Sequence, residues 1–155
     1  MDRIIIGADH AGFSLKETVK PYLTERKIAV TDVGADSAEP VDYPDFGKKV
    51  AEGVSSGKFD RGVLVCGSGV GMTITANKYP KVRAVLCLDE ETARLSRLHN
   101  DTNILVLAGR RTDAETAKRI VGTWLSTTFD GGRHQRRLDK ITHIESNLYR
   151  SQCKE

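Results

Sequence analysis

The chain has little of several features that would point to particular classes of protein. Its three cysteines, Cys66, Cys87 and Cys153, form no Cys-x-x-Cys pair and no metal-type spacing. The sequence therefore predicts neither a disulfide framework nor a structural zinc site. No apolar run approaches the roughly 20 residues that span a bilayer, and the amino terminus lacks the regions of a signal peptide. We therefore expect a cytoplasmic protein that does not bind membranes.

Strong net charge is also missing. The formal charge is +3 over 155 residues, which is too small to indicate a nucleic-acid partner. Hydrophobic residues make up 39% and charged residues 29% of the chain, as in ordinary globular proteins, and this length predicts one domain, 1–155. Positive charge is concentrated locally, which suggests an anionic ligand. The basic residues concerned are Arg110, Arg111, Arg133, Arg136, Arg137 and Lys140.

Short apolar runs alternate with helix-like segments along the whole chain. This repeated order predicts an α/β protein with a parallel sheet and helices on both of its faces. Strands are expected at residues 3–7, 28–33, 62–66, 82–86 and 103–107. Helices are expected at residues 14–26, 42–56, 70–78, 90–98, 113–127 and 133–149. Capping-box spacing at Ser14 and Glu17, and again at Thr112 and Glu115, supports two of these helix starts.

The last predicted helix carries an apolar stripe that no later strand accompanies. Leu138, Ile141, Ile144 and Leu148 recur at spacings of three and four residues, which places them on one helix face. This face either covers the sheet of its own domain or packs on a second subunit.

The run from Gly62 to Gly71 is the most informative stretch of the sequence. It reads as a buried strand that ends in Cys66, followed by glycines at alternate positions and then a helix. Glycines permit positive φ and close backbone approach, so successive N–H groups can converge on an anion. The run lacks the G-x-G-x-x-G fingerprint and no GK[ST] follows, so nucleotide binding is disfavoured.

Ligands of parallel sheets bind beyond the carboxyl ends of the strands. Polar residues and glycines gather there after the first, third and fifth predicted strands. They include Asp9-His10, the Cys66 turn and Gly109-Arg110. The sequence therefore predicts a small-molecule site at this edge.

Two readings of Cys66 and Ser68 remain open from the residues alone. Cys66 is either a small buried hydrophobe or a thiol whose pKa the neighbouring amides lower. Ser68 is either a turn residue bonded to its own backbone or a group that exchanges protons with a substrate oxygen. Cys87 and Cys153 have no comparable setting, and we expect them to be structural or incidental.

Histidines and arginines supply the other candidates. His10 follows the first strand, whereas His99 and Asn100 end the fourth helix, where an imidazole could move protons between sugar oxygens and Asn100 could simply cap the helix. Arg133 and Arg137 are four residues apart and thus share a helix face. That face is either solvated or a phosphate clamp to which Arg110 would add a third guanidinium.

These residues together resemble one family over nearly the whole chain. The motifs that carry the resemblance are Asp9-His10-Ala-Gly12, Asp42-Tyr43-Pro44, Cys66-Gly-Ser-Gly-Val-Gly71, Ala76-Asn77-Lys78, Arg83-Ala84, His99-Asn-Asp-Thr-Asn103 and Gly131-Gly-Arg-His134. The sequence is similar to type B ribose-5-phosphate isomerases, a group that includes galactose-6-phosphate and allose-6-phosphate isomerases.

The resemblance implies a Rossmann-like three-layer α/β/α sandwich with five parallel strands, which works as a homodimer or a dimer of dimers with the active site near the subunit interface. It also implies an aldose–ketose isomerase of phosphorylated sugars that needs no metal or organic cofactor. Some relatives use a glutamate at the position of Thr75 as the base, but this chain has threonine there and Cys66 instead.

The resemblance further implies a role for each candidate. Cys66 would be the base, His99 would open the sugar ring, and Ser68 would assist proton transfer. Backbone amides of Gly67, Ser68, Gly69, Val70 and Gly71 would hold an enediolate. The sugar would be contacted by Asp9, His10 and Asn100, and the phosphate by Arg110, Arg133 and Arg137, in part from the partner subunit.

We therefore expect interconversion of ribose 5-phosphate and ribulose 5-phosphate. The alternatives are the same chemistry on allose 6-phosphate, galactose 6-phosphate or a tetrose phosphate, and a non-catalytic subunit that binds sugar phosphates. Joint presence of the thiol, the histidine and the arginines disfavours the non-catalytic alternative.

Overall fold

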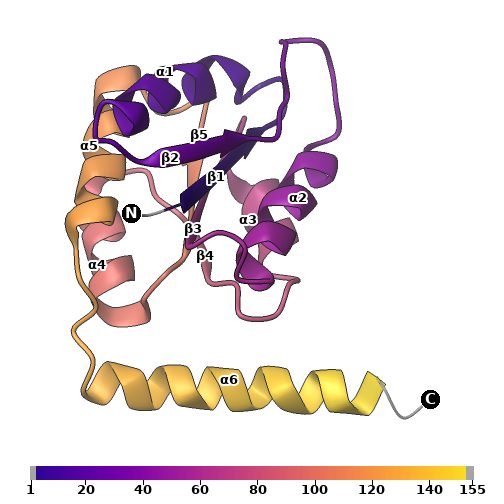
Figure 1. Ribbon diagram of the computed structural model, residues 1–155, viewed down its shortest axis with the longest axis vertical. Coiled ribbons are helices and arrows are strands. Elements are labelled where there is room, and N and C mark those ends of the chain that lie inside the picture. Colours follow the sequence, from indigo (N-terminus) through magenta and orange to yellow (C-terminus); the bar gives the residue numbers. More distant parts are fainter. Residues whose placement is uncertain (1–2, 153–155) are drawn as a thin grey trace.

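The centre of the molecule is a sheet of five parallel strands (Figure 1). The structure, a computed structural model, describes residues 3–152, so Cys153 lies outside the described residues. The strands are β1 (Arg3–Ala8), β2 (Ala29–Asp32), β3 (Arg61–Cys66), β4 (Ala84–Leu86) and β5 (Ile104–Ala108). Their order is β2-β1-β3-β5-β4, so β3 is central. The predicted parallel sheet is confirmed, with strand bounds within two residues of those expected.

Within residues 3–152, six helices connect and flank these strands. They are α1 (Phe13–Thr24), α2 (Tyr43–Ser55), α3 (Val70–Ala76), α4 (Glu90–Asn100), α5 (Ala114–Ser126) and α6 (Arg133–Gln152). All six were expected, but both capping-box predictions were wrong. Ser14 lies inside α1, which begins after Gly12, where a Cβ would collide with the Val65 carbonyl oxygen. Asp113, rather than Thr112, caps α5 by accepting the Thr116 N–H at 2.9 Å.

Two apolar cores lie on the two faces of the sheet, which confirms the three-layer sandwich. Ile4 and Ile6 point to the face covered by α1, α4 and α5, whereas Ile5 points to the face covered by α2 and α3. This alternation follows from the period of two in a strand. Full burial of each such side chain contributes roughly 1.5–3 kcal/mol. Trp124 of α5 is also fully buried, and its Nε1–H donates to Thr102 Oγ1 at 2.9 Å.

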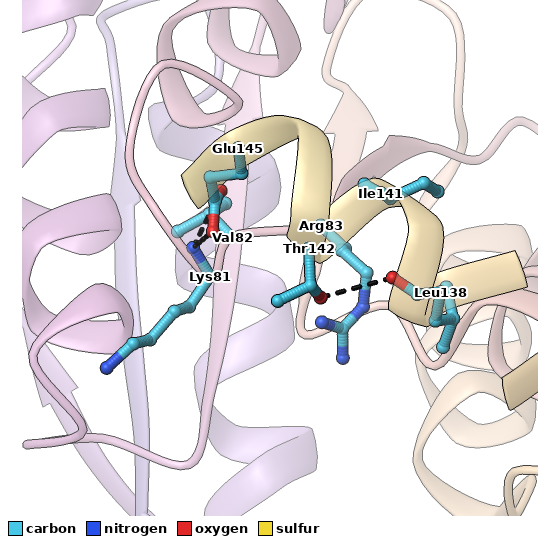
Figure 2. A pocket seen from close by; sticks show the side chains of 7 residues that line it. All are labelled: Lys81, Val82, Arg83, Leu138, Ile141, Thr142 and Glu145. Atoms are coloured by element: carbon cyan, nitrogen blue, oxygen red, sulfur yellow. Dashed lines mark hydrogen bonds between the residues drawn. The ribbon is translucent and has the colours of Figure 1, made fainter. Parts of the chain in front are cut away.

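Helix α6 lies outside these layers and runs past one end of the molecule (Figure 1). Leu138, the first residue of its apolar stripe, is buried, but the rest of the stripe does not cover the sheet: Ile141, Ile144 and Leu148 are 51%, 59% and 60% exposed. Glu145 ties the helix to the body by accepting the Lys81 N–H at 3.0 Å, beside a small cavity of about 80 Å³ (Figure 2). Neither α6 nor any other helix within residues 3–152 is long and apolar enough to cross a membrane.

Candidate active site

Cys66 ends the central strand and lies under a turn of glycines. The side chain is buried, and its Sγ accepts the Gly69 N–H at 3.2 Å. Gly69 has a φ of 79°, and a Cβ there would collide with the Leu86 side chain. Only glycine therefore lets the chain reverse here and aim its amides at the thiol and the space beside it. The Cys66 sulfur thus lies within hydrogen-bond distance of a backbone N–H of the turn.

Cys87 provides an internal contrast. It is fully buried in the core, and this burial raises the pKa of its thiol to about 12. A thiol with that pKa stays neutral at physiological pH and cannot act as a base.

Among residues 3–152, no group of three or more His, Cys, Asp or Glu side chains is placed to hold a metal ion.

Asp9 and His10 follow β1, directly beside β3. The Asp9 carboxylate is buried and accepts the Gly12 N–H at 2.9 Å, while the Asp9 N–H donates to Val65 just before Cys66. The His10 ring is anchored through Nδ1, which lies 3.1 Å from both the backbone nitrogen and the carbonyl oxygen of Val41. Both side chains are thus held at the same edge as the thiol.

Arg110 and Ser68 complete this edge. Arg110 follows β5; its N–H donates to the Gly67 carbonyl at 3.1 Å, and its guanidinium packs against Gly67. Ser68 is exposed, and its Oγ accepts the Val70 N–H at 3.3 Å, so its hydroxyl proton is free for another acceptor. We call this group the turn half-site. Its members are Asp9, His10, Cys66, Gly67, Ser68, Gly69, Val70, Gly71 and Arg110.

Tyr43 was not among the site residues that the sequence suggested, yet it lies at the turn half-site. Its ring covers Gly71 so closely that a Cβ there would strike it. The ring is 41% exposed, so it forms a wall beside the glycine turn. The only sequence signal for this residue was its place in the Asp42-Tyr43-Pro44 motif.

The remaining predicted residues form a second group. His99 and Asn100 are the last residues of α4, and Arg133 and Arg137 lie in the first turns of α6. The two helices meet where the His99 and His134 rings stack, with centroids 4.2 Å apart and an interplanar angle of 11°. We call these five residues the helix-end half-site.

His134 is the second residue that sequence reasoning missed. Burial lowers the pKa of its imidazole, and the positive charges of His99, Arg133 and Arg137 lower it further. A neutral His134 can stack on His99 without placing two imidazolium charges face to face. No local pattern could reveal this contact, because it depends on the path of α6 relative to α4.

The two half-sites lie at opposite ends of the strands. The turn half-site lies at the carboxyl ends, and the helix-end half-site lies toward the amino ends. Helix α4 begins after the carboxyl end of β4 and ends just before the amino end of β5. Its 11 residues therefore carry the chain back by about 16 Å at 1.5 Å per residue. Figure 1 shows α6 starting near the far end of α4, away from the carboxyl ends of the strands. The structure thus brings the predicted residues together in two groups rather than one.

The protein is an α/β protein with a thiol and converging amides at the carboxyl ends of its parallel strands. This is where such proteins bind small molecules. The ribose/galactose isomerase family matches this chain over residues 4–141. The chain belongs to that family and is an enzyme, a sugar-phosphate isomerase.

Individual relatives agree with this assignment. The chain is 47% identical over 145 residues to the ribose-5-phosphate isomerase B of Escherichia coli, covering 94% of this chain and 97% of that one. It also resembles a solved structure of Clostridium thermocellum ribose-5-phosphate isomerase B, with a TM-score of 0.92, 49% identity and coverage of 94% and 99%. The D-erythrulose-4-phosphate isomerase of Pectobacterium atrosepticum is 39% identical over 143 residues, covering 92% of this chain and 94% of that one.

Proposed function

We propose that this chain interconverts ribose 5-phosphate and ribulose 5-phosphate in a homodimer, or a dimer of dimers, whose active sites are shared between chains. Each site would combine the turn half-site of one chain with the helix-end half-site of its partner. One observation carries the proposal: the base candidate and the ring-opening candidate lie at opposite ends of the strands, so a single chain cannot bring them to one sugar.

The chemistry divides naturally between the two half-sites. His99 would move the proton that opens the furanose ring, with Asn100 holding a hydroxyl. The Cys66 thiolate would then remove the proton from C2 of the aldose and return it to C1, while Ser68 moves a proton between the two oxygens. Between these steps the N–H groups of Gly67–Gly71 would stabilise the negative charge of the enediolate by hydrogen bonding.

Phosphate binding would join the half-sites. Arg110 comes from the turn half-site, whereas Arg133 and Arg137 come from the helix-end half-site and are exposed. Guanidinium groups bind phosphate through charge-assisted hydrogen bonds. Held at the end remote from the reacting carbons, the phosphate would orient C1 and C2 toward Cys66.

The exposed face of α6 supports the assembly. Ile141, Ile144 and Leu148 form an apolar stripe on the same helix that begins with the two arginines. A two-fold dimer buries the same patch of both chains. Packing this stripe on a partner would remove apolar surface from water and carry Arg133 and Arg137 to the other chain.

Mixing two inactive variants tests shared sites directly. Chains with Cys66→Ala and chains with His99→Asn are refolded together, and ribose 5-phosphate isomerisation is measured without added metal or cofactor. If the sites are shared, each mixed dimer has one intact site, and random pairing in two-fold dimers restores about a quarter of wild-type activity. Complementation shows both that the chain isomerises ribose 5-phosphate and that its sites are shared.

Refolding each variant alone is the control, since neither should regain activity. Mixtures that stay inactive although mass spectrometry shows mixed dimers would mean that each chain holds its complete site, and would overturn the shared-site proposal.

The substrate is tested separately, because the same half-sites could serve another phosphorylated aldose. The relative from Pectobacterium atrosepticum is named for a four-carbon substrate. Wild-type turnover is therefore compared across four-, five- and six-carbon aldose phosphates. A higher kcat/KM for a substrate other than ribose 5-phosphate would reassign the substrate and leave the shared-site chemistry intact.

A further inference from the structure

Asp101 breaks two local rules where α4 ends. It is the C-cap of the helix and adopts a left-handed conformation with φ of 44° and ψ of 47°, a position usually taken by glycine. It also places a carboxylate at the negative end of the helix dipole, where cations are favoured. A carboxylate in this position is unfavourable unless cationic partners hold it.

Two arginines hold the Asp101 carboxylate. Arg83 Nη2 donates to Oδ2 at 2.9 Å, and Arg97 Nη1 donates to Oδ1 at 2.8 Å. Both arginines also bind the backbone of the turn: Arg83 donates to the carbonyls of Asn100 and Asp101, and Arg97 donates to the Thr102 carbonyl at 2.6 Å. Side chain and main chain of the helix end are thus fixed together.

Asp101, Arg83 and Arg97 together form what we call the Asp101 clamp. The two arginines of this clamp are themselves held by rigid parts of the molecule. Arg97 is only 6% exposed, and its guanidinium lies over the ring of the fully buried Trp124, 5.8 Å from the centroid. The Arg83 N–H donates to Asn103 Oδ1 at 2.7 Å, which ties it to the start of β5. Figure 2 shows Arg83 beneath α6. The clamp therefore links the end of α4 to the core and to the start of β5.

We infer that Asp101, held by Arg83 and Arg97, is a positioning residue for His99 and Asn100. These two residues immediately precede it and form the last turn of α4. The clamp sets the direction of that turn, and the stack on His134 then fixes the His99 ring. The effect on catalysis rests on the proposed role of His99 in ring opening, whereas the effect on the His99 ring itself does not.

Two substitutions separate the carboxylate from the backbone shape. Asp101→Gly keeps the left-handed turn at no steric cost but removes both ion pairs, and Asp101→Asn keeps the shape and size of the side chain without the charge. The matched control is Asp113→Asn, which makes the same change at the N-cap of α5.

The His99 imidazole is followed by NMR, with its signal identified through His99→Gln, and kcat and KM are measured for ribose 5-phosphate. We expect both Asp101 variants to fold, and the His99 signal to shift in both but not in the control. We expect kcat to fall about 10- to 100-fold in Asp101→Gly, as for a misplaced catalytic group, with KM little changed, and Asp101→Asn to lie between Asp101→Gly and wild type.

An Asp101→Gly protein with the wild-type His99 signal and wild-type kcat would show that Asp101 merely ends the helix. If that variant does not fold, the NMR signal of Asp101→Asn decides in the same way. If the wild-type protein turns over no sugar phosphate, the proposed function fails, but the imidazole measurement still decides whether Asp101 positions His99.

Discussion

The two half-sites are built in different ways. The turn half-site rests on backbone: a buried thiol, amides converging from a glycine turn, and a carboxylate held by the Gly12 N–H. The helix-end half-site rests on side chains at the ends of two helices, and its arginines and Asn100 are exposed. The first is organised within one chain, whereas the second presents its polar groups outward.

This difference matches the two kinds of work proposed for them. Stabilising an enediolate requires dipoles that are already in place, because reorganising them during the reaction costs energy. Binding a phosphate that arrives from solvent requires accessible charges. The comparison predicts that loss of Cys66 in the turn half-site lowers kcat, and that loss of a helix-end arginine raises KM.

The largest effect is expected from Cys66→Ala. Removing a general base should lower kcat by roughly 10²- to 10⁴-fold, while binding of a non-reacting sugar phosphate, measured by calorimetry, persists. Cys87→Ala is the matched control, since that thiol is neutral and buried in the core. Near-normal turnover by Cys66→Ala would remove this residue as the base.

A smaller and more selective effect is expected from His99→Asn. If His99 opens the ring, kcat for ribose 5-phosphate should fall by about 100-fold. A four-carbon aldose 4-phosphate cannot close a five-membered ring and should be affected much less, provided that the wild-type protein accepts it. An equal loss on both substrates would place His99 in a later step.

Arg137→Ala should act on binding. Loss of one charge-assisted hydrogen bond to phosphate costs about 1.5 kcal/mol, so KM should rise about 10-fold with kcat nearly unchanged. Arg136→Ala, one position along the same helix, is the control and should leave KM alone. An unchanged KM in Arg137→Ala would exclude it from the phosphate site.

The smallest effect concerns stability and pH. The pKa of His134 lies below its ordinary value near 6.5, first because of burial and then because of the charges around it. As pH falls through 6.5, the unfolded chain therefore takes up this proton before the folded chain does, and the free energy of unfolding decreases.

Thermal unfolding between pH 7.5 and about pH 5.5 measures the contribution of His134 to the pH dependence of stability. His134→Gln should show a shallower loss of stability on acidification than the wild type. His143→Gln, also on α6 but exposed, should follow the wild-type curve. A wild-type slope in His134→Gln would show that this imidazole does not titrate differently in the folded state.

Much of the fold could be predicted because local patterns carry it. The alternation of strands and helices was enough for the parallel sheet, and glycines at 67, 69 and 71 marked the turn. The helix caps were predicted less well: Gly12 begins α1 because its backbone contacts β3, a tertiary reason that capping-box spacing does not contain.

The site could be predicted as a set of residues but not as an arrangement. Nothing in the spacing of Cys66 and His99 shows that α4 carries them to opposite ends of the strands. The stack of His99 on His134 and the cover of Tyr43 over Gly71 are likewise contacts between distant segments. Periodicity reports which face is buried, and only the path of the chain shows which faces meet.

The central place of β3 has one further consequence, for local opening of the molecule. Both edges of β3 are hydrogen-bonded, to β1 and to β5, so its amides can exchange hydrogen with solvent only when the whole sheet opens. Helix α6 lies outside the layers, so its exposed carboxyl-terminal turns can open without disturbing them. The candidate base is thus carried by the segment expected to exchange last, whereas the carboxyl-terminal turns of α6 are expected to exchange among the first.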